Sequence, residues 1–246
     1  MNRVTAPVAH RESRNSDEFI HCSNCKVKDC SILQHCGTAC LDVISDAKKM
    51  CHFVPGQRIL MEGNFAKGVY FIEEGKVKIY KTNSKGQEII LRFAGPGDII
   101  GYNSTEDSSE YHVSAISISD AVTCFIDAVT FQRLMNEFPA FSLALLQYYK
   151  KQLQITEQKT LKMATMTVPE KVADALLIMY QAYGASGATR DLNLTLSRQD
   201  MANLAGTTKE QVSKAISDLK NQGIIDARGK HISLIDLDSL RKIAKF

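Results

Sequence analysis

Between His52 and about Asp127, apolar and polar residues alternate in short runs that glycine and proline interrupt. Alternation with a period of two places every second side chain on the same face, as in strands that bury one face. Glycine turns at short, regular spacing are typical of small all-β domains. The pattern therefore predicts a small antiparallel barrel or jelly roll. Its strongest runs cover residues 58–61, 68–75, 76–80, 88–93, 98–100 and 121–126.

Helical periodicity surrounds these strands. A short helix is predicted over 42–51, and Phe131 and Phe138 belong to an amphipathic segment that Pro139 ends. A longer helix is predicted over 140–166, because large side chains recur three to four positions apart with no capping signal between them. A helix packed only on its own barrel would show the same stripe. The length favours a two-stranded coiled coil, and hence a homodimer.

Proline marks a hinge after the long helix. Within Thr167–Pro169, the proline disfavours helix for the residue before it and suits the start of a new helix. A helix over 170–183 and a loop over 184–191 follow. Residues 224–234 have the alternation of a small β-hairpin, which we interpret as a wing beside the preceding helices.

Two short amphipathic helices are predicted within 197–225. Gly206 allows the tight bend between them, Ser197 is a suitable N-cap for the first, and Thr207 or Thr208 for the second. In the second helix the apolar positions are Val212, Ala215, Ile216 and Leu219. The opposite face displays Lys209, Glu210, Ser213 and Lys214. Such a helix can enter a DNA major groove, although an ordinary helical hairpin with a solvated polar face has the same pattern.

Charge gives modest support to a nucleic-acid partner. The chain has 246 residues, enough for two domains, and its net charge of +3 is too small to imply nucleic acid by itself. From Ser197 to the end, nine Lys and Arg face six Asp and Glu, so this segment holds a surplus equal to the net charge of the chain. A local basic surface suits contacts to phosphates.

No apolar run approaches the roughly 20 residues needed to span a bilayer, and the N-terminus lacks the apolar core of a signal peptide. Residues 1–19 instead resemble a flexible polar arm. We therefore expect a cytoplasmic protein without a membrane partner. In a reducing compartment, clustered thiols more often bind metals or take part in redox chemistry than form disulfides.

Five of the seven cysteines fall within nineteen residues, with the spacing C-x2-C-x4-C-x5-C-x3-C. Closely spaced thiolates in a turn-rich segment can grip one metal centre. Four of them suit either tetrahedral zinc or an iron–sulfur cluster, and spacing alone does not choose between the two. The five are Cys22, Cys25, Cys30, Cys36 and Cys40.

Barrel, long helix, hinge, helix–turn–helix and wing, in this order, resemble the cyclic-AMP-receptor/FNR (CRP/FNR) family of transcription regulators. The motifs that carry the resemblance include Pro55–Gly56, Pro96–Asp98, Leu196–Asp200 and Lys209–Lys214. The resemblance implies an α+β fold with a cyclic-nucleotide-binding-like β-roll, a long dimerisation helix and a C-terminal winged helix–turn–helix. The implied divisions are an arm (1–19), a cysteine-rich segment (20–41), a sensor (42–128), a dimerisation region (129–166) and a DNA-binding domain (167–246).

The same resemblance implies double-stranded DNA with a two-fold-symmetric operator as the partner of a homodimer, and contact with RNA polymerase. Glu210 would accept from a cytosine amino group. Lys214 stands where the family usually has arginine, so the usual bidentate guanine contact is lost. The DNA-binding residues it implies are Ser197, Arg198, Thr208, Lys209, Glu210, Ser213 and Lys214.

Cyclic-nucleotide control is not expected. Cyclic-AMP binders of the family use a Gly-Glu pair to hold the ribose and an arginine to neutralise the phosphate, whereas the matching positions here are Gly101–Tyr102 and Val113. A phosphate there would lack its partner, and His112 could supply only a pH-dependent charge.

The FNR branch of the family holds an oxygen-labile [4Fe-4S] cluster on three N-terminal cysteines and one cysteine of the barrel. That resemblance implies the ligand set Cys22, Cys25, Cys30 and Cys124, with Cys36 as a competing ligand. A buried core cysteine is the plain alternative for Cys124.

These observations lead to one main hypothesis: a homodimeric DNA-binding transcription regulator controlled by an iron–sulfur cluster that responds to oxygen or nitric oxide. The alternative is the same DNA-binding regulator with a different signal. In it the cysteines form a structural zinc site or a thiol redox site, or an unidentified small effector binds in the β-roll. An enzyme with a Cys/His nucleophile is not expected, because no Asp or Asn orienter and no oxyanion loop accompany the histidines.

Overall fold

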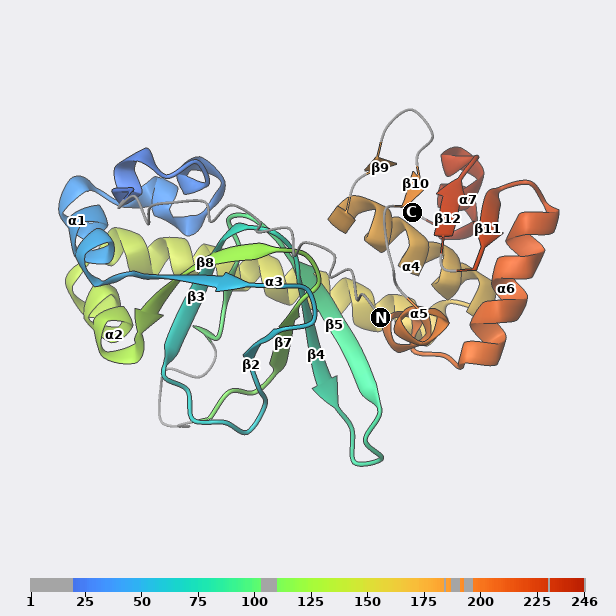
Figure 1. Ribbon diagram of the computed structural model, residues 1–246, viewed down its shortest axis with the longest axis horizontal. Helices are drawn as coiled ribbons and strands as arrows, with labels where there is room; N and C mark the ends of the chain where they lie inside the picture. The colour runs from blue at the N-terminus through green and yellow to red at the C-terminus, as the bar shows by residue number, and fades with distance from the viewer. Residues whose placement is uncertain are drawn as a thin grey trace, which may run out of the picture.

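The computed structural model describes residues 20–102, 110–183, 185–186, 191–192, 197–229 and 231–245. The predicted polar arm, Leu196 and Lys230 lie outside these residues. Figure 1 shows a β-rich sensor on the left, a mostly helical domain on the right, and one long helix that runs behind the sensor strands towards the second domain. The α+β fold class predicted from the sequence is confirmed.

The sensor is an antiparallel roll of two four-stranded sheets, in the orders β1-β8-β3-β6 and β2-β7-β4-β5. Apolar side chains from both sheets, among them Ile72, Val77 and Ala115, fill its interior, as the alternation predicted. The strands are β1 (Lys49–Phe53), β2 (Arg58–Leu60), β3 (Gly68–Glu74), β4 (Val77–Thr82), β5 (Glu88–Ala94), β6 (Ile99–Ile100), β7 (Ser114–Ser117) and β8 (Ala121–Asp127).

Local patterns were wrong at two places. The helix predicted over 42–51 is α1 (Thr38–Ala47), and the residues after it form β1, where Met50 pairs with Cys124 of β8. This strand exists because the sheet offers a partner, and helical periodicity in a short window cannot detect that. The loop predicted over 184–191 contains two short strands, β9 (Ala185–Ser186) and β10 (Asp191–Leu192), which pair with each other.

Three 3-10 turns, η1 (Cys22–Asn24), η2 (Lys28–Cys30) and η3 (Ile32–His35), wrap the cysteine segment against the roll. Beyond the strands, α2 (Ala128–Glu137) starts where the Asp127 carboxylate accepts the Thr130 amide at 2.9 Å. The long helix α3 (Pro139–Thr165) has Pro139 in its first turn, a position that needs no backbone donor.

The reader domain comprises α4 (Val168–Tyr183), α5 (Arg198–Ala205), α6 (Lys209–Asn221), α7 (Leu237–Ile243) and a sheet in the order β11-β12-β10-β9. Within this sheet β11 (Ile225–Arg228) and β12 (His231–Leu234) form the predicted hairpin. Leu176, Met201, Val212 and Leu240 meet in one apolar core. That core holds α5 and α6 at a fixed angle, with α6 on the outer side in Figure 1.

Candidate functional site

The first reader helix is fixed at both ends. Ser197 caps α5, because its hydroxyl accepts the Asp200 amide at 3.1 Å while the Asp200 carboxylate accepts the Ser197 amide at 3.1 Å. Gly206 ends the helix with φ 61°, and a Cβ there would lie 2.3 Å from the Met163 methyl carbon. The bend therefore requires glycine both for its backbone angle and for its close approach to α3.

The second reader helix, α6, presents one polar face to solvent. Thr208, rather than Thr207, is its N-cap, and the Thr208 hydroxyl accepts the Gln211 amide at 3.3 Å. The four apolar positions predicted for burial are all buried. Exposed on the other face are Lys209, Glu210, Ser213 and Lys214, joined by Gln211 and Ser217, which the sequence analysis did not select. Ser217 follows Ser213 by one helical turn, so its spacing could have identified it.

Two predicted backbone contacts, Ser197 and Arg198, are half-buried at the start of α5. Burial lowers the pKa of the Arg198 guanidinium. Its Nη1 atom has no hydrogen-bond partner among the residues that the structure describes. A buried guanidinium nitrogen without a partner is costly, and a phosphate oxygen would satisfy it.

The hairpin beside α6 carries an exposed cation. Arg228 pairs with Asp226 at 3.0 Å, and Lys220 of α6 pairs with the same carboxylate at 3.0 Å. Lys220 also donates to the Ala227 carbonyl at 2.9 Å. The hairpin is thereby tied to the reader helix, and Arg228 remains largely exposed.

A second candidate site lies between the 3-10 turns and the roll. Cys22 and Cys25 from the η1 segment and Cys124 from β8 line one cavity, whose walls also include Phe71 and Glu73 of β3. Residues about one hundred positions apart in the sequence thus meet at one site. Cys22 and Cys124 are buried, and Cys25 is half-buried. We call this the thiol cavity.

The fourth predicted ligand, Cys30, does not itself line the thiol cavity but packs against Gly97, which does. Gly97, which lines the cavity, has φ 89°, and a Cβ on it would lie 2.9 Å from the Cys30 sulfur. The Cys30 thiol is exposed and donates to the Val27 carbonyl at 3.3 Å. The missing side chain at Gly97 is what allows the Cys30 backbone and thiol to pack against this turn.

Two thiols of this cavity, Cys124 and Cys25, resist ionisation. Burial raises the pKa of Cys124 to about 12, and the nearby Glu73, Cys22 and Cys25 raise it further while Lys48 lowers it. Burial also raises the pKa of Cys25. Thiolates are the form that binds metals, so a positive centre is needed to hold several of them here.

Among the residues described, no three His, Cys, Asp or Glu side chains are arranged to hold a single metal ion. Four thiolates on one zinc at about 2.3 Å would lie only about 3.8 Å from one another. In a four-iron cluster each cysteine binds a different iron, so the ligating sulfurs surround a larger centre. Thiols are soft donors, which both zinc and iron–sulfur clusters accept.

Cys36 and Cys40 lie in a different pocket from the thiol cavity. They line an open pocket at the start of α1, together with Phe138 and Phe141. The two thiols share a hydrogen bond, which raises the pKa of Cys36 and lowers that of Cys40. Cys36, predicted as a competing ligand, therefore faces Cys40 rather than the thiol cavity.

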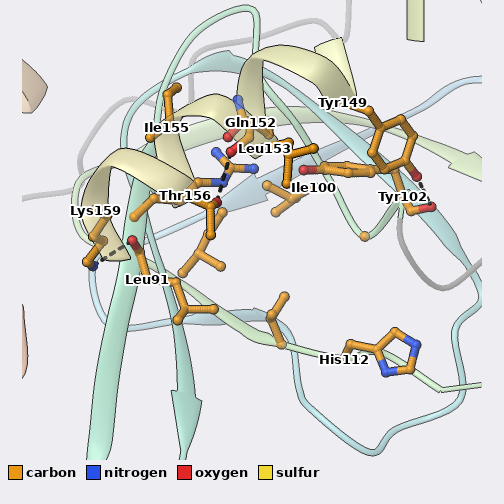
Figure 2. Close-up of a pocket in the computed structure, with 14 residues that line it drawn as sticks. Leu91, Ile100, Tyr102, His112, Tyr149, Gln152, Leu153, Ile155, Thr156 and Lys159 are labelled. Atoms are coloured by element: carbon orange, nitrogen blue, oxygen red, sulfur yellow. Dashed lines mark hydrogen bonds between the residues drawn. The ribbon is translucent and has the colours of Figure 1, made fainter. Parts of the chain in front are cut away.

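A third candidate site is a pocket of about 320 Å³ between the roll and α3, which we call the α3 pocket. Figure 2 shows Tyr102, Tyr149 and Lys159 around it, with His112 on the far side. The Tyr149 hydroxyl donates to the Tyr102 carbonyl at 3.1 Å, and the two rings meet edge to face at 4.8 Å. Tyr102, expected from the resemblance to stand in place of a ribose-binding glutamate, is thus held against α3 at the edge of this pocket.

Two cations that the sequence analysis missed line the α3 pocket. The Arg92 guanidinium donates to the Ile99 carbonyl at 3.3 Å, and the Lys159 ammonium donates to the carbonyls of Ile90 and Leu91 at 2.7 and 2.9 Å. Burial lowers the pKa of Lys159 to about 8. The sequence could have identified both cations, because each is a basic residue at a position where the strand or helix pattern predicts an apolar side chain that points inward. Among the residues described, no acidic side chain lines the pocket.

Two family models match the chain. A cyclic nucleotide-binding domain covers residues 50–138, and a Crp-like helix-turn-helix domain covers residues 170–243. None of the helices that the structure describes is long and apolar enough to cross a membrane.

Similar proteins are transcription regulators. An anaerobic regulatory protein of Haemophilus influenzae is 25% identical over 97% of this chain and 93% of its own length. A CRP-like cAMP-activated global transcriptional regulator of Mycobacterium tuberculosis is 28% identical over 78% of this chain and 87% of its own. The solved structure of FixK2 from Bradyrhizobium japonicum, 26% identical, matches 80% of this chain and 96% of its own with a TM-score of 0.68. These relatives differ in the signals their names imply, so similarity alone does not choose the signal.

Proposed function

The chain belongs to the CRP/FNR family of DNA-binding transcription regulators, and from this premise we propose that it is a cytoplasmic homodimer controlled by an iron–sulfur cluster in the thiol cavity. The family assignment confirms the predicted fold class and the prediction that the chain is not an enzyme. The observation that carries the proposal is the meeting of Cys22, Cys25 and Cys124 at one cavity, with Cys30 packed against Gly97 of the same cavity.

Support for the cluster comes from the donor set. Cys22, Cys25, Cys30 and Cys124 would hold it, and burial raises the pKa of Cys124 and Cys25, so that a positive centre is needed to hold these two as thiolates. A [4Fe-4S] cluster would supply a centre that oxygen or nitric oxide disassembles. Cysteine thiolates are the ligands such clusters use.

The cysteine segment has a physical route to the long helix. Ile32 and Leu33 of η3 are buried in one apolar cluster with Phe141 and Leu145 of α3. Ordering of the segment by ligands on both sides of the thiol cavity would therefore change how α3 is supported. A two-state shift in α3 packing is the means by which we propose the signal reaches DNA.

The dimer is proposed to form along α3. Its exposed apolar side chains include Leu143, Leu146 and Leu153, which are 57%, 63% and 59% exposed. They are three and seven positions apart, the a/d spacing of a coiled coil. A second copy of the same helix would cover them and place two α6 helices against successive major grooves of a two-fold operator, about one DNA turn apart.

Cyclic AMP is not proposed as the effector. Arg92 and Lys159 could attract a phosphate. Among the residues that line the pocket, however, no acidic side chain is present to bind the ribose hydroxyls, and Tyr102 stands where the resemblance would place that acid. Each protomer would still have to contact RNA polymerase to activate transcription, and we propose this contact from the family alone.

The test is anaerobic purification followed by iron, sulfide and zinc analysis, with DNA binding measured before and after exposure to air. We expect about four irons and four sulfides per protomer, and weaker DNA binding after air. A colourless, iron-free protein whose DNA binding is unchanged by air would contradict the sensing proposal. Zinc without acid-labile sulfide would support the alternative, a structural zinc site at the same cysteines.

A further inference from the structure

One ammonium group joins the sensor to the reader domain. Lys78 of β4 has a side chain only 11% exposed, and its Nζ lies 3.0 Å from Glu88 of β5 and 3.3 Å from Asp200 of α5. Desolvation opposes the charge, but the two carboxylates outweigh it, so the pKa of Lys78 is raised. The group therefore stays charged at neutral pH.

Asp200 connects this cation to the geometry of α5. One carboxylate oxygen accepts the Ser197 amide and hydroxyl at 3.1 and 2.8 Å, and the other faces Lys78. The residue that fixes the start of α5 is thus the residue that binds the sensor. Movement of α5 away from β4 would leave a buried cation with one partner fewer, which is costly.

Apolar contacts also join the sensor to the reader domain. Ile90 of β5 is fully buried and belongs to the apolar core of the reader domain, not to that of the roll. The Lys159 ammonium of α3 donates to the carbonyls of Ile90 and Leu91, so the same strand is also tied to the long helix. Strand β5, helix α3 and helix α5 therefore form one connected block.

This docking leaves the DNA-reading face free. Lys209, Glu210, Ser213 and Lys214 are exposed, and Figure 1 shows α6 at the outer side of the reader domain, away from the sensor strands. The contact at Lys78 consequently orients the reader without covering it.

We propose that Lys78 is a positioning residue for DNA binding: through Asp200 it holds the reader domain against the sensor, so that both readers of a dimer engage one operator together. The inference rests on the proposed homodimer. Two readers bind much more tightly than one only when their separation is fixed to match the two half-sites. A reader that swings on the 167–169 hinge would keep its base contacts but lose this advantage.

The test compares a full operator with a half operator. The probe is the tightest two-fold duplex selected from a random pool by the wild-type protein, and the same duplex with one half scrambled. We expect Lys78→Met to weaken binding to the full duplex at least about tenfold, and to change binding to the half duplex less than about twofold. Lys78→Arg, which keeps the charge, should retain most of the wild-type preference.

Lys81→Met is the matched control. Lys81 lies on the same strand and pairs with the sensor residue Glu62 at 3.2 Å, with both side chains partly exposed. We expect it to leave binding to both duplexes unchanged. If Lys78 acts through Asp200, then Lys78→Met combined with Asp200→Asn should weaken full-duplex binding no more than the stronger single variant does.

Each other result contradicts the proposal in a distinguishable way. Equal weakening on both duplexes, additive effects of the two variants, or an unchanged preference in Lys78→Met would overturn the positioning role alone. A wild-type protein that is monomeric by light scattering and binds both duplexes equally would overturn the dimer and the positioning role together. Urea unfolding of each variant identifies any general loss of folding.

Discussion

The sensor contains two cavities whose chemistry differs sharply. The thiol cavity has mostly apolar walls, one glutamate and cysteines from two distant segments, whereas the α3 pocket has tyrosines and two cations but, among the residues described, no acidic lining. The first can hold a soft metal centre only after its thiols lose protons. The second can hold a small molecule with no change of protonation. The pocket follows from the roll and its long helix, which the family shares, while the thiol cavity depends on a few side chains of this chain.

This difference indicates which of the two cavities is expected to respond to the signal. A roll with a helix across its mouth forms a pocket whatever its side chains are, so a pocket there says little about control. Three cysteines that line one cavity from segments about one hundred positions apart are a more specific feature. The thiol cavity is also connected to the start of α3, through the apolar cluster that contains Ile32 and Leu33.

The largest expected effect comes from removing the barrel cysteine. Cys124→Ser should reduce iron in the anaerobically purified protein by more than about tenfold, because a buried ligand to one iron is lost. Cys51→Ser is the matched control, since Cys51 lies on the neighbouring strand β1 opposite Thr123. It should keep its iron. Equal iron in both variants would show that Cys124 is only a core residue.

A second substitution pair decides the third ligand. Cys30→Ser should lose most of its iron, because Cys30 packs against Gly97, which lines the thiol cavity. Cys36→Ser should retain it, because Cys36 faces Cys40 in a separate pocket. The opposite pattern of iron contents would exchange the roles of the two cysteines.

A smaller effect concerns the charge of the α3 pocket. Burial lowers the pKa of Lys159 to about 8, so between about pH 8 and 10.5 the unfolded chain binds a proton that the folded chain has lost. Wild-type stability should therefore rise across this range relative to Lys159→Met, by about 2 kcal/mol when partial exposure is allowed for. Urea unfolding of both proteins at pH 7 and pH 10 measures it. A constant difference would mean that the amine is not desolvated.

The smallest expected effect is that of cyclic AMP, which should leave the melting temperature of the protein unchanged at about 1 mM. A ligand present at one hundred times its dissociation constant would add about 2.7 kcal/mol of stability, or several degrees for a chain of this size. Such a shift would show that Arg92 and Lys159 suffice to hold the phosphate without an acid for the ribose.

Sequence patterns predicted those parts of the fold that local chemistry determines. The caps at Ser197 and Thr208, the bend at Gly206 and the two faces of α6 follow from interactions within a few residues, and the structure contains them. Strand β1 was missed because it depends on pairing with β8, far along the chain. Strand β7 was missed because its small polar residues alternate weakly.

The candidate site was predictable as a set of residue types but not as an arrangement. Cysteine spacing identified the thiols, and only the fold separates Cys36 and Cys40 from the other three. The contact between Lys78 and Asp200 joins residues 122 positions apart. No periodicity within a single sequence relates such residues, because their proximity arises from how the two domains pack.

The most direct test of the thiol cavity as the sensor is a single titration of an operator duplex with anaerobically purified protein, before and after the same sample meets air. We expect binding to weaken together with the loss of iron, and to be indifferent to added cyclic AMP. Binding that survives complete loss of iron, or that requires cyclic AMP, would contradict the account.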